Sequence, residues 1–522
     1  MSAPSAPSPE GDLSPDQELA TDHLTQDLGR RSRRGGVVLL GAQAVRVLGQ
    51  MGTLVVLARL LPPSAFGLLA MVAAIGLVLD LIKEFGLSSA TIQKSDITHG
   101  QVSALFWINA GVGAVLAALL FLAAPLIAHF YGQPELESIA RWLSIGFLAS
   151  GLTVQHWALL RRQMRFVAIA GMETTADLAS FAASIALAAT GAGYWALVVQ
   201  RLIPPLLMLL ASWAFCRWRP SLPQRAAGVR SLLGFGAGVT VSQLAGAFAR
   251  SVDQILIGWL WGPAVLGLYE RTTRLLLVPI NTINAPIYAA AMPALSRVTD
   301  DPARYRSMFS QVMQKLGLLT MPVFALAAVT ADWVVDILFG PSWHQAIPLV
   351  ALFSVSATFL PVLMACGLLY LTQARTADML QATLLDAAVA VVAILVGLPW
   401  GVIGVAASIA IVGLLLRMPL AFWLSARRGP VGVGMVWRAV APPASIAIAI
   451  ALIVGALRVL LLPDRTPAAM ATVAATALAV GLLGLLAWPD TRQEVRQILA
   501  VCSARLATSP ARPSASRRAA RG

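Results

Sequence analysis

The chain has 522 residues, of which 58% are hydrophobic and only 12% are charged, whereas charged residues make up about a quarter of a typical soluble protein. Apolar stretches recur from Gly36 to Trp488. Each is long enough, at about 20 residues, to cross a bilayer core of about 30 Å as a helix. This composition excludes a string of soluble domains and predicts an all-α, polytopic membrane protein.

The 38 basic residues outnumber the 24 acidic ones, giving a formal net charge of +14. In a soluble chain such an excess would favour nucleic-acid binding, so the positions of the charges must decide. The three cysteines, Cys216, Cys366 and Cys502, and the five scattered histidines show no metal-ligand spacing. We therefore expect no disulfide framework, no metal site and no cofactor.

Residues 1–35 are polar, so we expect a disordered cytoplasmic tail rather than a cleavable signal peptide. The apolar stretches that follow predict about 14 transmembrane helices, at residues 36–60, 65–86, 103–129, 136–160, 166–190, 194–215, 229–259, 264–290, 312–338, 345–371, 377–398, 401–424, 436–461 and 468–488. They divide the chain into an N-terminal six-helix lobe (36–215), a cytoplasmic inter-lobe linker (216–228), a C-terminal six-helix lobe (229–424), helices 13 and 14 (436–488) and a basic cytoplasmic tail (489–522).

Positive charge is distributed unevenly over the segments between these spans. If the N-terminus is inside, nearly every lysine and arginine of the connecting segments lies inside, and the outer loops carry Arg465. Cytoplasmic loops of membrane proteins show this excess. The asymmetry predicts a multi-pass plasma-membrane protein with both termini cytoplasmic, and it explains the net charge without nucleic acid.

The chain partly repeats at an offset of 200 residues. Residues 61–70 read LPPSAFGLLA and residues 261–270 read WGPAVLGLYE, so Pro63 corresponds to Pro263 and Gly67 to Gly267. Parallel repeats in transporters commonly place a substrate site at their interface. The alternative is that Pro-Gly turns recur by chance between short-looped helices.

Polar side chains form stripes on the first helices of both lobes. In the N-terminal lobe, Gln43, Arg46 and Gln50 lie three and four residues apart, which places them on one helical face. In the C-terminal lobe, the predicted helix 229–259 carries Gln243, Arg250 and Gln254, and the predicted helix 264–290 carries Arg271, Arg274, Asn281 and Asn284. Because lipid does not tolerate such groups, we expect these residues to line a wet, substrate-binding cavity. The alternative is that they join helices through hydrogen bonds and local ion pairs.

A cavity centred on these arginines would be net positive. The planar donor fork of arginine suits phosphate, so an anionic, phosphate-bearing substrate is favoured over a cationic drug. Three acids within the predicted spans, Glu173, Asp177 and Asp386, have no basic neighbour close in sequence. Because a buried carboxylate can carry a proton, these three are candidates for ion coupling.

Seven segments, taken in order, carry a family resemblance. They are LARLLPPSAFGLLAM (57–71), FGLSSATIQ (85–93), LRRQMRF (160–166), GAGYWALVVQ (191–200), VDQILIGWLWGPAVLGLY (252–269), MPALSR (292–297) and LFGPSWHQAIP (338–348). In them the chain resembles bacterial polysaccharide exporters of the colanic-acid type. These belong to the oligosaccharide flippase branch of the multidrug/oligosaccharidyl-lipid/polysaccharide exporter superfamily.

The resemblance implies a two-lobed bundle whose central cavity opens alternately to each side of the membrane. It implies transfer of undecaprenyl-pyrophosphate-linked oligosaccharide from the inner to the outer leaflet, for exopolysaccharide, capsule or O-antigen biosynthesis. Cavity arginines would hold the pyrophosphate and a proton or sodium gradient would drive transport. Membrane lipids, a polysaccharide polymerase and chain-length proteins are candidate partners. The chain departs from the family at Glu270, where an uncharged residue is more usual.

Two other classes of function are less well matched by these residues. A cation-coupled multidrug exporter of the same fold should have an acidic or aromatic cavity, whereas the stripes here carry arginines and amides. A membrane polymerase or ligase would need a large soluble-side loop for sugar chemistry, and the predicted outer loops are short. The sequence therefore favours a transporter over an enzyme.

Overall fold

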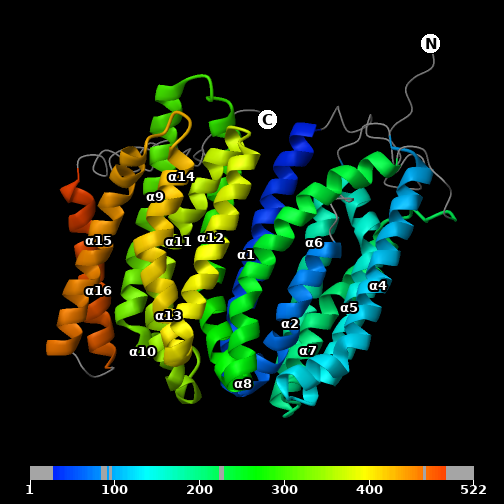
Figure 1. The fold of residues 1–522 in the computed structure, drawn as a ribbon, viewed down its shortest axis with the longest axis horizontal. Coiled ribbons are helices and arrows are strands. Elements are labelled where there is room, and N and C mark those ends of the chain that lie inside the picture. The colour runs from blue at the N-terminus through cyan, green and yellow to red at the C-terminus, as the bar shows by residue number, and fades with distance from the viewer. Residues whose placement is uncertain (1–27, 84–90, 93–96, 223–228, 462–465, 489–522) are drawn as a thin grey trace, which may run out of the picture.

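The computed structural model describes residues 28–83, 91–92, 97–222, 229–461 and 466–488, with side chains described in these ranges except at 28–40, 80–83 and 229–250. Regular structure in these ranges is entirely helical, which confirms the predicted all-α fold. Figure 1 shows α2 and α4–α7 grouped on one side of the molecule and α9–α16 on the other, with α1 and α8 between them.

Six long helices build the N-terminal lobe within the described residues. They are α1 (Leu28–Leu60), α2 (Pro63–Lys83), α4 (His99–Tyr131), α5 (Glu135–Arg162), α6 (Phe166–Ala189) and α7 (Trp195–Phe215). Capping residues define both ends of α4. Thr98 and Gln101 form a reciprocal capping box at the start of α4, and Gly132 ends that helix in the left-handed region at φ 65°.

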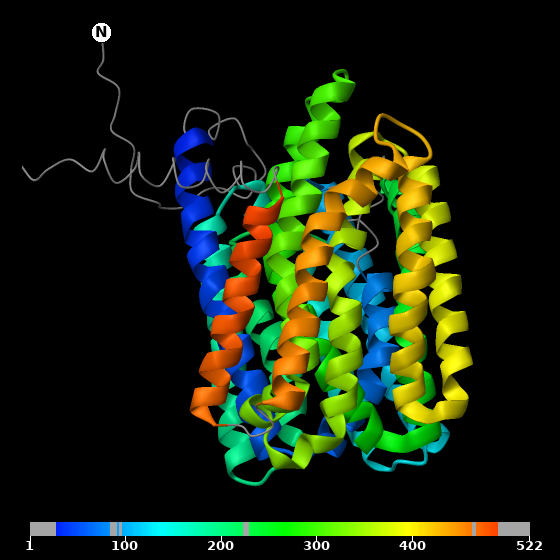
Figure 2. The same cartoon turned by 90° about the vertical axis from the view of Figure 1, so that its left-hand side faces the viewer.

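The C-terminal lobe begins with α8 (Val229–Ser296), a 68-residue segment that is interrupted at Gly262. It continues through α9 (Pro302–Val329), α10 (Ala331–Leu338), the 3-10 helix η2 (Pro341–Ala346), α11 (Ile347–Thr372), α12 (Thr376–Gly397), the 3-10 helix η3 (Leu398–Trp400), α13 (Gly401–Val412), the π-helical turn η4 (Gly413–Arg417) and α14 (Met418–Ala426). Two further helices, α15 (Val433–Leu460) and α16 (Pro467–Ala487), follow. Figure 2 shows them on the outer face of this lobe, where α15 packs against α9.

Ten segments of the described chain are long and apolar enough to cross a membrane. Two of these, Ser251–Ser296 and Thr376–Ala426, contain 46 and 51 residues, more than the roughly 20 that one crossing needs. The protein is thus a polytopic membrane protein, while the predicted number of 14 spans stays a prediction.

Some predicted boundaries were wrong. Helix α1 begins at Leu28 and therefore includes residues 28–35, which we assigned to a disordered tail. The leucine and arginines of this stretch have high helix propensity, which a reading based on charge alone overlooks. Helix α9 begins at Pro302, ten residues before the predicted span, because Asp301 caps its first turn. The predicted tails at 1–27 and 489–522 lie outside the described residues.

The two halves of the predicted repeat meet each other directly where α2 crosses α8. A methyl group on Gly67 would lie 1.7 Å from the carbonyl oxygen of Pro263, and one on Gly267 would lie 1.8 Å from that of Pro63. The contact is reciprocal, as expected of a pseudo-twofold axis between repeats. Glycine at both positions allows the two backbones to touch. Gly262, at φ 76° and ψ −176°, makes the sharp turn that precedes this contact.

Further contacts join the lobes at the same end of the molecule, which we call the Pro63 end. The indole of Trp343 is fully buried, and its Nε1 donates a 2.7 Å hydrogen bond to the carbonyl of Ala58 at the end of α1. The Arg59 guanidinium donates to the carbonyls of Ile337 and Leu338 at the C-terminus of α10, where helix carbonyls lack intrahelical partners. The lobes are thus joined by hydrogen bonds as well as by packing at this end.

Candidate functional site

A cavity of about 550 Å³ lies between the N-terminal lobe and α8. Its wall is built by α1, α2, α4, α5, α6 and α7 together with α8 of the other lobe. Four arginines and two acids are among its lining residues, namely Arg46, Arg201, Arg271, Arg274, Asp177 and Glu270. Four glutamines also line it: Gln43, Gln50, Gln200 and Gln254. The charged groups on the wall are therefore mostly basic, and the amides add donors and acceptors.

The structure brings most of the predicted stripe residues to this one cavity. Six of them line it, from α1 and from α8: Gln43, Arg46, Gln50, Gln254, Arg271 and Arg274. Asn281 is exposed and lies outside the lining, because seven residues beyond Arg274 is about 10 Å farther along the helix. The side chains of Gln243 and Arg250 lie outside the described residues.

Two polar lining residues that come from α7, Gln200 and Arg201, were absent from the predicted stripes. The adjacent pair Gln200–Arg201 stands out as polar within the otherwise apolar α7. That signal was present in the sequence, but two adjacent residues do not form a stripe.

Arg46 lies between two carboxylates of α6. Its Nη1 is 2.5 Å from Oε2 of Glu173, and its Nε is 2.9 Å from Oδ2 of Asp177. The two acids are four residues apart, on one face of the helix. In sequence these carboxylates have no basic neighbour nearby, but the packing of α1 against α6 supplies one. The charge of Arg46 is therefore already balanced in this structure.

The two arginines of α8 differ in their surroundings. Arg274 lies 3.3 Å from Glu270, one turn earlier on the same helix. The Arg271 side chain is buried, with 5% of the residue exposed, and its guanidinium carbon lies 3.9 Å from the centre of the Phe66 ring. In the described part of the chain no carboxylate pairs with Arg271, and its Nε has no hydrogen-bond partner.

A desolvated guanidinium without a counter-charge is costly. Stacking on an aromatic ring offsets some of this cost, and a bound anion would offset more. Arg271 is thus the cavity residue whose surroundings point most directly to an anionic ligand.

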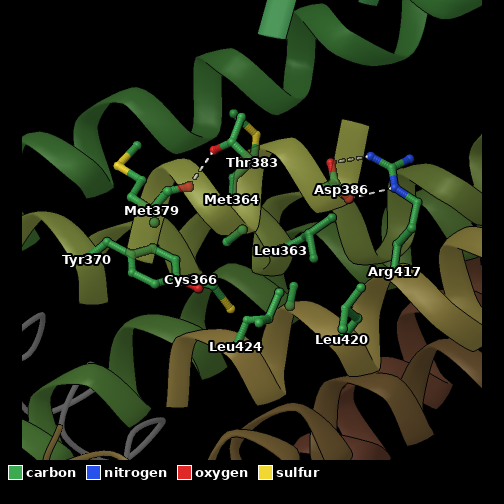
Figure 3. A pocket seen from close by; sticks show the side chains of 13 residues that line it. Leu363, Met364, Cys366, Tyr370, Met379, Thr383, Asp386, Arg417, Leu420 and Leu424 are labelled. Carbon is green, nitrogen blue, oxygen red and sulfur yellow. Dashed lines mark hydrogen bonds and ion pairs between the residues drawn. The ribbon is translucent and has the colours of Figure 1, made fainter. Parts of the chain in front are cut away.

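The third predicted coupling residue, Asp386, lies elsewhere, in a smaller pocket between α11, α12 and α14. This pocket has a volume of about 180 Å³ and a mainly apolar lining (Figure 3). Arg417, at the end of the π-helical turn, holds Asp386 through two contacts of 2.7 and 2.8 Å. Asp386 is therefore paired and separate from the arginine cavity. Across the described residues, no group of three or more His, Cys, Asp or Glu side chains is placed to hold a metal ion.

Comparison with protein families identifies this architecture. The family described as "polysaccharide biosynthesis protein" matches residues 56–348, more than half of the chain. The chain belongs to this family. The matched region includes both Pro-Gly segments of the repeat, Pro63 and Phe66 of α2, and Arg271 of α8. The family resemblance inferred from the sequence is confirmed.

Curated relatives are similar over a similar region. The chain is 27% identical over 326 residues to lipopolysaccharide biosynthesis protein WzxC of Escherichia coli, covering 61% of this chain and 65% of that protein. It is 26% identical to teichuronic acid biosynthesis protein TuaB of Bacillus subtilis, with 53% and 58% covered. It is 25% identical to succinoglycan biosynthesis transport protein ExoT of Rhizobium meliloti, with 60% and 65% covered. The chain thus spans less than two thirds of the length of these relatives.

Solved structures show the same fold at low sequence identity. The lipid II flippase MurJ in an inward closed conformation matches with a TM-score of 0.66 at 13% identity, covering 89% of this chain and all of MurJ. An inward-facing multidrug resistance MATE family transporter matches with a TM-score of 0.54 at 13% identity, covering 77% of this chain and 99% of that one. These two likenesses show a shared fold and leave the function to be argued from the cavity.

Proposed function

We propose that this protein is a flippase that moves an undecaprenyl-pyrophosphate-linked oligosaccharide from the inner to the outer leaflet of the bacterial plasma membrane. It would serve the biosynthesis of a cell-surface polysaccharide such as exopolysaccharide, capsule or O-antigen. The observation that carries the proposal is the arginine cavity with the buried Arg271, which no carboxylate of the described residues contacts and whose Nε has no hydrogen-bond partner among them. The names of the relatives, which concern polysaccharide biosynthesis and transport, support it.

The chemistry of the cavity fits a pyrophosphate headgroup. Arginine offers parallel N–H donors in a planar fork, and charge-assisted hydrogen bonds to phosphate are roughly twice as strong as neutral ones. Arg271, Arg274 and Arg201 lie on the wall with glutamine amides between them. The arginines would offset the desolvation of the phosphates, the sugars would occupy the hydrated space, and the lipid tail would stay in the bilayer.

Transport would proceed by alternating access of this cavity to the two leaflets. The lobes are joined at the Pro63 end by the Gly67–Pro263 crossing and by Trp343. The charge asymmetry of the loops would place this end outside and both termini in the cytoplasm. In this orientation the structure is closed toward the outside. Rocking of one lobe against the other would open the Pro63 end and close the opposite end.

The driving force would come from a proton or sodium gradient, with Glu173, Asp177 and Asp386 as the candidate coupling residues. The first two contact a cavity arginine, whereas Asp386 pairs with Arg417 in the separate pocket. A polysaccharide polymerase and chain-length proteins remain candidate partners, since the transported unit must be polymerised after it crosses.

The proposal is tested by a flipping assay in liposomes with a lipid-pyrophosphate oligosaccharide. Loss of a hydrogen bond to a charged group is worth about 1.5–3 kcal/mol, and 1.4 kcal/mol is a factor of ten. Arg271→Ala should therefore flip the substrate at least about tenfold more slowly than wild type. The matched control is Arg141→Ala, which removes an arginine paired with Glu137 outside the cavity lining and should flip normally.

Two results would contradict the proposal. One is a flipping rate of Arg271→Ala equal to that of the Arg141→Ala control. The other is transport of cationic dyes by the wild-type protein without any flipping of the lipid substrate. The second result would favour a multidrug exporter of the same fold, the alternative suggested by the likeness to a MATE transporter.

A further inference from the structure

Glu270 places a carboxylate on the wall of a cavity whose charged groups are mostly basic. It lines the cavity together with its chain neighbour Arg271 and with Arg274, one helical turn farther along α8. Its side chain is 18% exposed, so it is largely withdrawn from bulk solvent. A carboxylate beside a phosphate site opposes the binding of phosphate. Its presence there favours a role toward another part of the ligand.

The contact with Arg274 leaves Glu270 much of its capacity to accept hydrogen bonds. Nη1 of Arg274 lies 3.3 Å from Oε1, which is longer than the about 2.7–2.9 Å usual for a charge-assisted hydrogen bond. This hydrogen bond reaches only Oε1 and leaves Oε2 for a ligand. Asp177, the other acid on the wall, is held more closely, at 2.9 Å from Arg46. Glu270 is thus the lining acid with more accepting capacity left.

Uncharged polar and aromatic side chains accompany Glu270 on the wall. They include Gln50 of α1, Gln254 of α8, Phe66 of α2 and Phe147 of α5. A carboxylate accepts hydrogen bonds from hydroxyl groups, and an amide both donates and accepts them. Aromatic rings offer an apolar surface on which C–H groups pack. Together these groups suit a neutral sugar, which carries hydroxyl groups around an apolar ring face.

A sugar bonded to the pyrophosphate must come close to Glu270. Arg271 is the buried arginine whose surroundings point to a phosphate, and Glu270 directly precedes it. In the proposed substrate the first sugar is attached directly to the pyrophosphate, so a phosphate at Arg271 brings that sugar to the same stretch of α8. A negative group on the sugar would meet the Glu270 charge in a partly desolvated space, where like charges repel strongly.

We propose that Glu270 selects the sugar nearest the pyrophosphate: it accepts hydrogen bonds from the hydroxyl groups of a neutral sugar and repels a uronic acid at that position. This inference rests on the proposed function, because it requires the pyrophosphate of the substrate in this cavity. The arginines supply the affinity common to all pyrophosphate-linked sugars. Glu270 determines which of those sugars is accepted.

The test uses the full-length protein in detergent micelles and two probes, farnesyl-pyrophosphoryl glucose and farnesyl-pyrophosphoryl glucuronic acid. The probes differ in one group of the sugar, a hydroxymethyl in the first and a carboxylate in the second. Their dissociation constants are measured by calorimetry at neutral pH, where the sugar carboxylate is ionised. Because like charges brought together in a binding site weaken binding, wild type should bind the glucose probe at least about tenfold more tightly.

Variants separate the charge of Glu270 from its effect on Arg274. In Glu270→Gln the two probes should bind with nearly equal affinity. In Glu270→Gln/Arg274→Gln no arginine is released, and the preference should again be lost. Arg274→Gln keeps the carboxylate and should retain the preference. The matched control Glu137→Gln removes an acid from an arginine pair outside the cavity lining and should discriminate as wild type does.

The outcomes distinguish this inference from the proposed function. Equal binding of both probes by wild type, or an unchanged preference in Glu270→Gln, would overturn the inference while the flippase proposal stands. A preference that returns in Glu270→Gln/Arg274→Gln would mean that the released Arg274, and not the lost charge of Glu270, abolished it, and would also overturn the inference. If wild type binds neither probe, both proposals fail.

Discussion

Substitution of Gly67 by alanine should weaken the contact that joins the two lobes at the Pro63 end. The added methyl group would lie 1.7 Å from the Pro263 carbonyl oxygen, whereas ordinary contacts begin at 3.4 Å. The helices must therefore separate by roughly 1.7 Å, and overpacking of this kind costs about 1–3 kcal/mol. Because 1.4 kcal/mol is a factor of ten, the closed arrangement should become about 5–150-fold less favoured.

The fraction of molecules in the closed arrangement can be measured by double electron-electron resonance between spin labels at exposed positions at this end. Leu60→Cys on α1 and Leu260→Cys on α8 provide such positions, in a background with the three native cysteines replaced. Wild type should give one short distance, and Gly67→Ala should add a longer one and slow flipping. Gly267→Ala should behave in the same way, because the contact is reciprocal.

The control for this series is Gly111→Ala in α4, where an added methyl group meets no atom within 4 Å. Alanine there should leave the distances unchanged and slightly raise the melting temperature, because alanine favours helix. If Gly67→Ala and Gly267→Ala gave the same distances and flipping rates as Gly111→Ala, the crossing would not be the tight contact that we describe. The reasoning about the closed end would then be refuted.

Three other substitutions should lower the melting temperature of the purified protein. Arg46→Ala leaves two carboxylates without their counter-charge, at a cost of about 1–3 kcal/mol, and neutralising both acids should restore stability. Trp343→Phe removes the indole donor to the buried Ala58 carbonyl, with a similar cost. Arg458→Ala breaks the two-point contact with Asp332, and limited proteolysis should then cut α15 sooner. An unchanged melting temperature in any of the three would count against the corresponding contact.

Much of the fold could be predicted from hydrophobic length and turn residues. The predicted span at 166–190 corresponds to α6 (Phe166–Ala189), and that at 436–461 to α15 (Val433–Leu460). The correspondence of Gly67 with Gly267 also predicted two related halves. The structure shows that these two glycines lie where the backbones of the two halves touch. The sequence could not show this contact, because similarity between two segments does not say that they pack against each other.

The candidate site could be predicted only in part. Helical spacing was enough to place Arg46, Arg271 and Arg274 on inward faces. It could not reveal that Arg46 is paired with Glu173, because the two residues are 127 positions apart. Nor could it show that Arg271 stacks on Phe66 of the other lobe. A stripe defines the direction in which side chains point, whereas their partners depend on how the helices pack.

The most direct test of the central claim is a structure of the protein with a lipid-pyrophosphate oligosaccharide bound, determined by electron cryomicroscopy in lipid nanodiscs. We predict density for the pyrophosphate in the cavity between the N-terminal lobe and α8, within hydrogen-bond distance of Arg271. Pyrophosphate density outside this cavity, for example beside Arg417, with the Arg271 guanidinium unchanged on Phe66 and without a partner, would contradict the account.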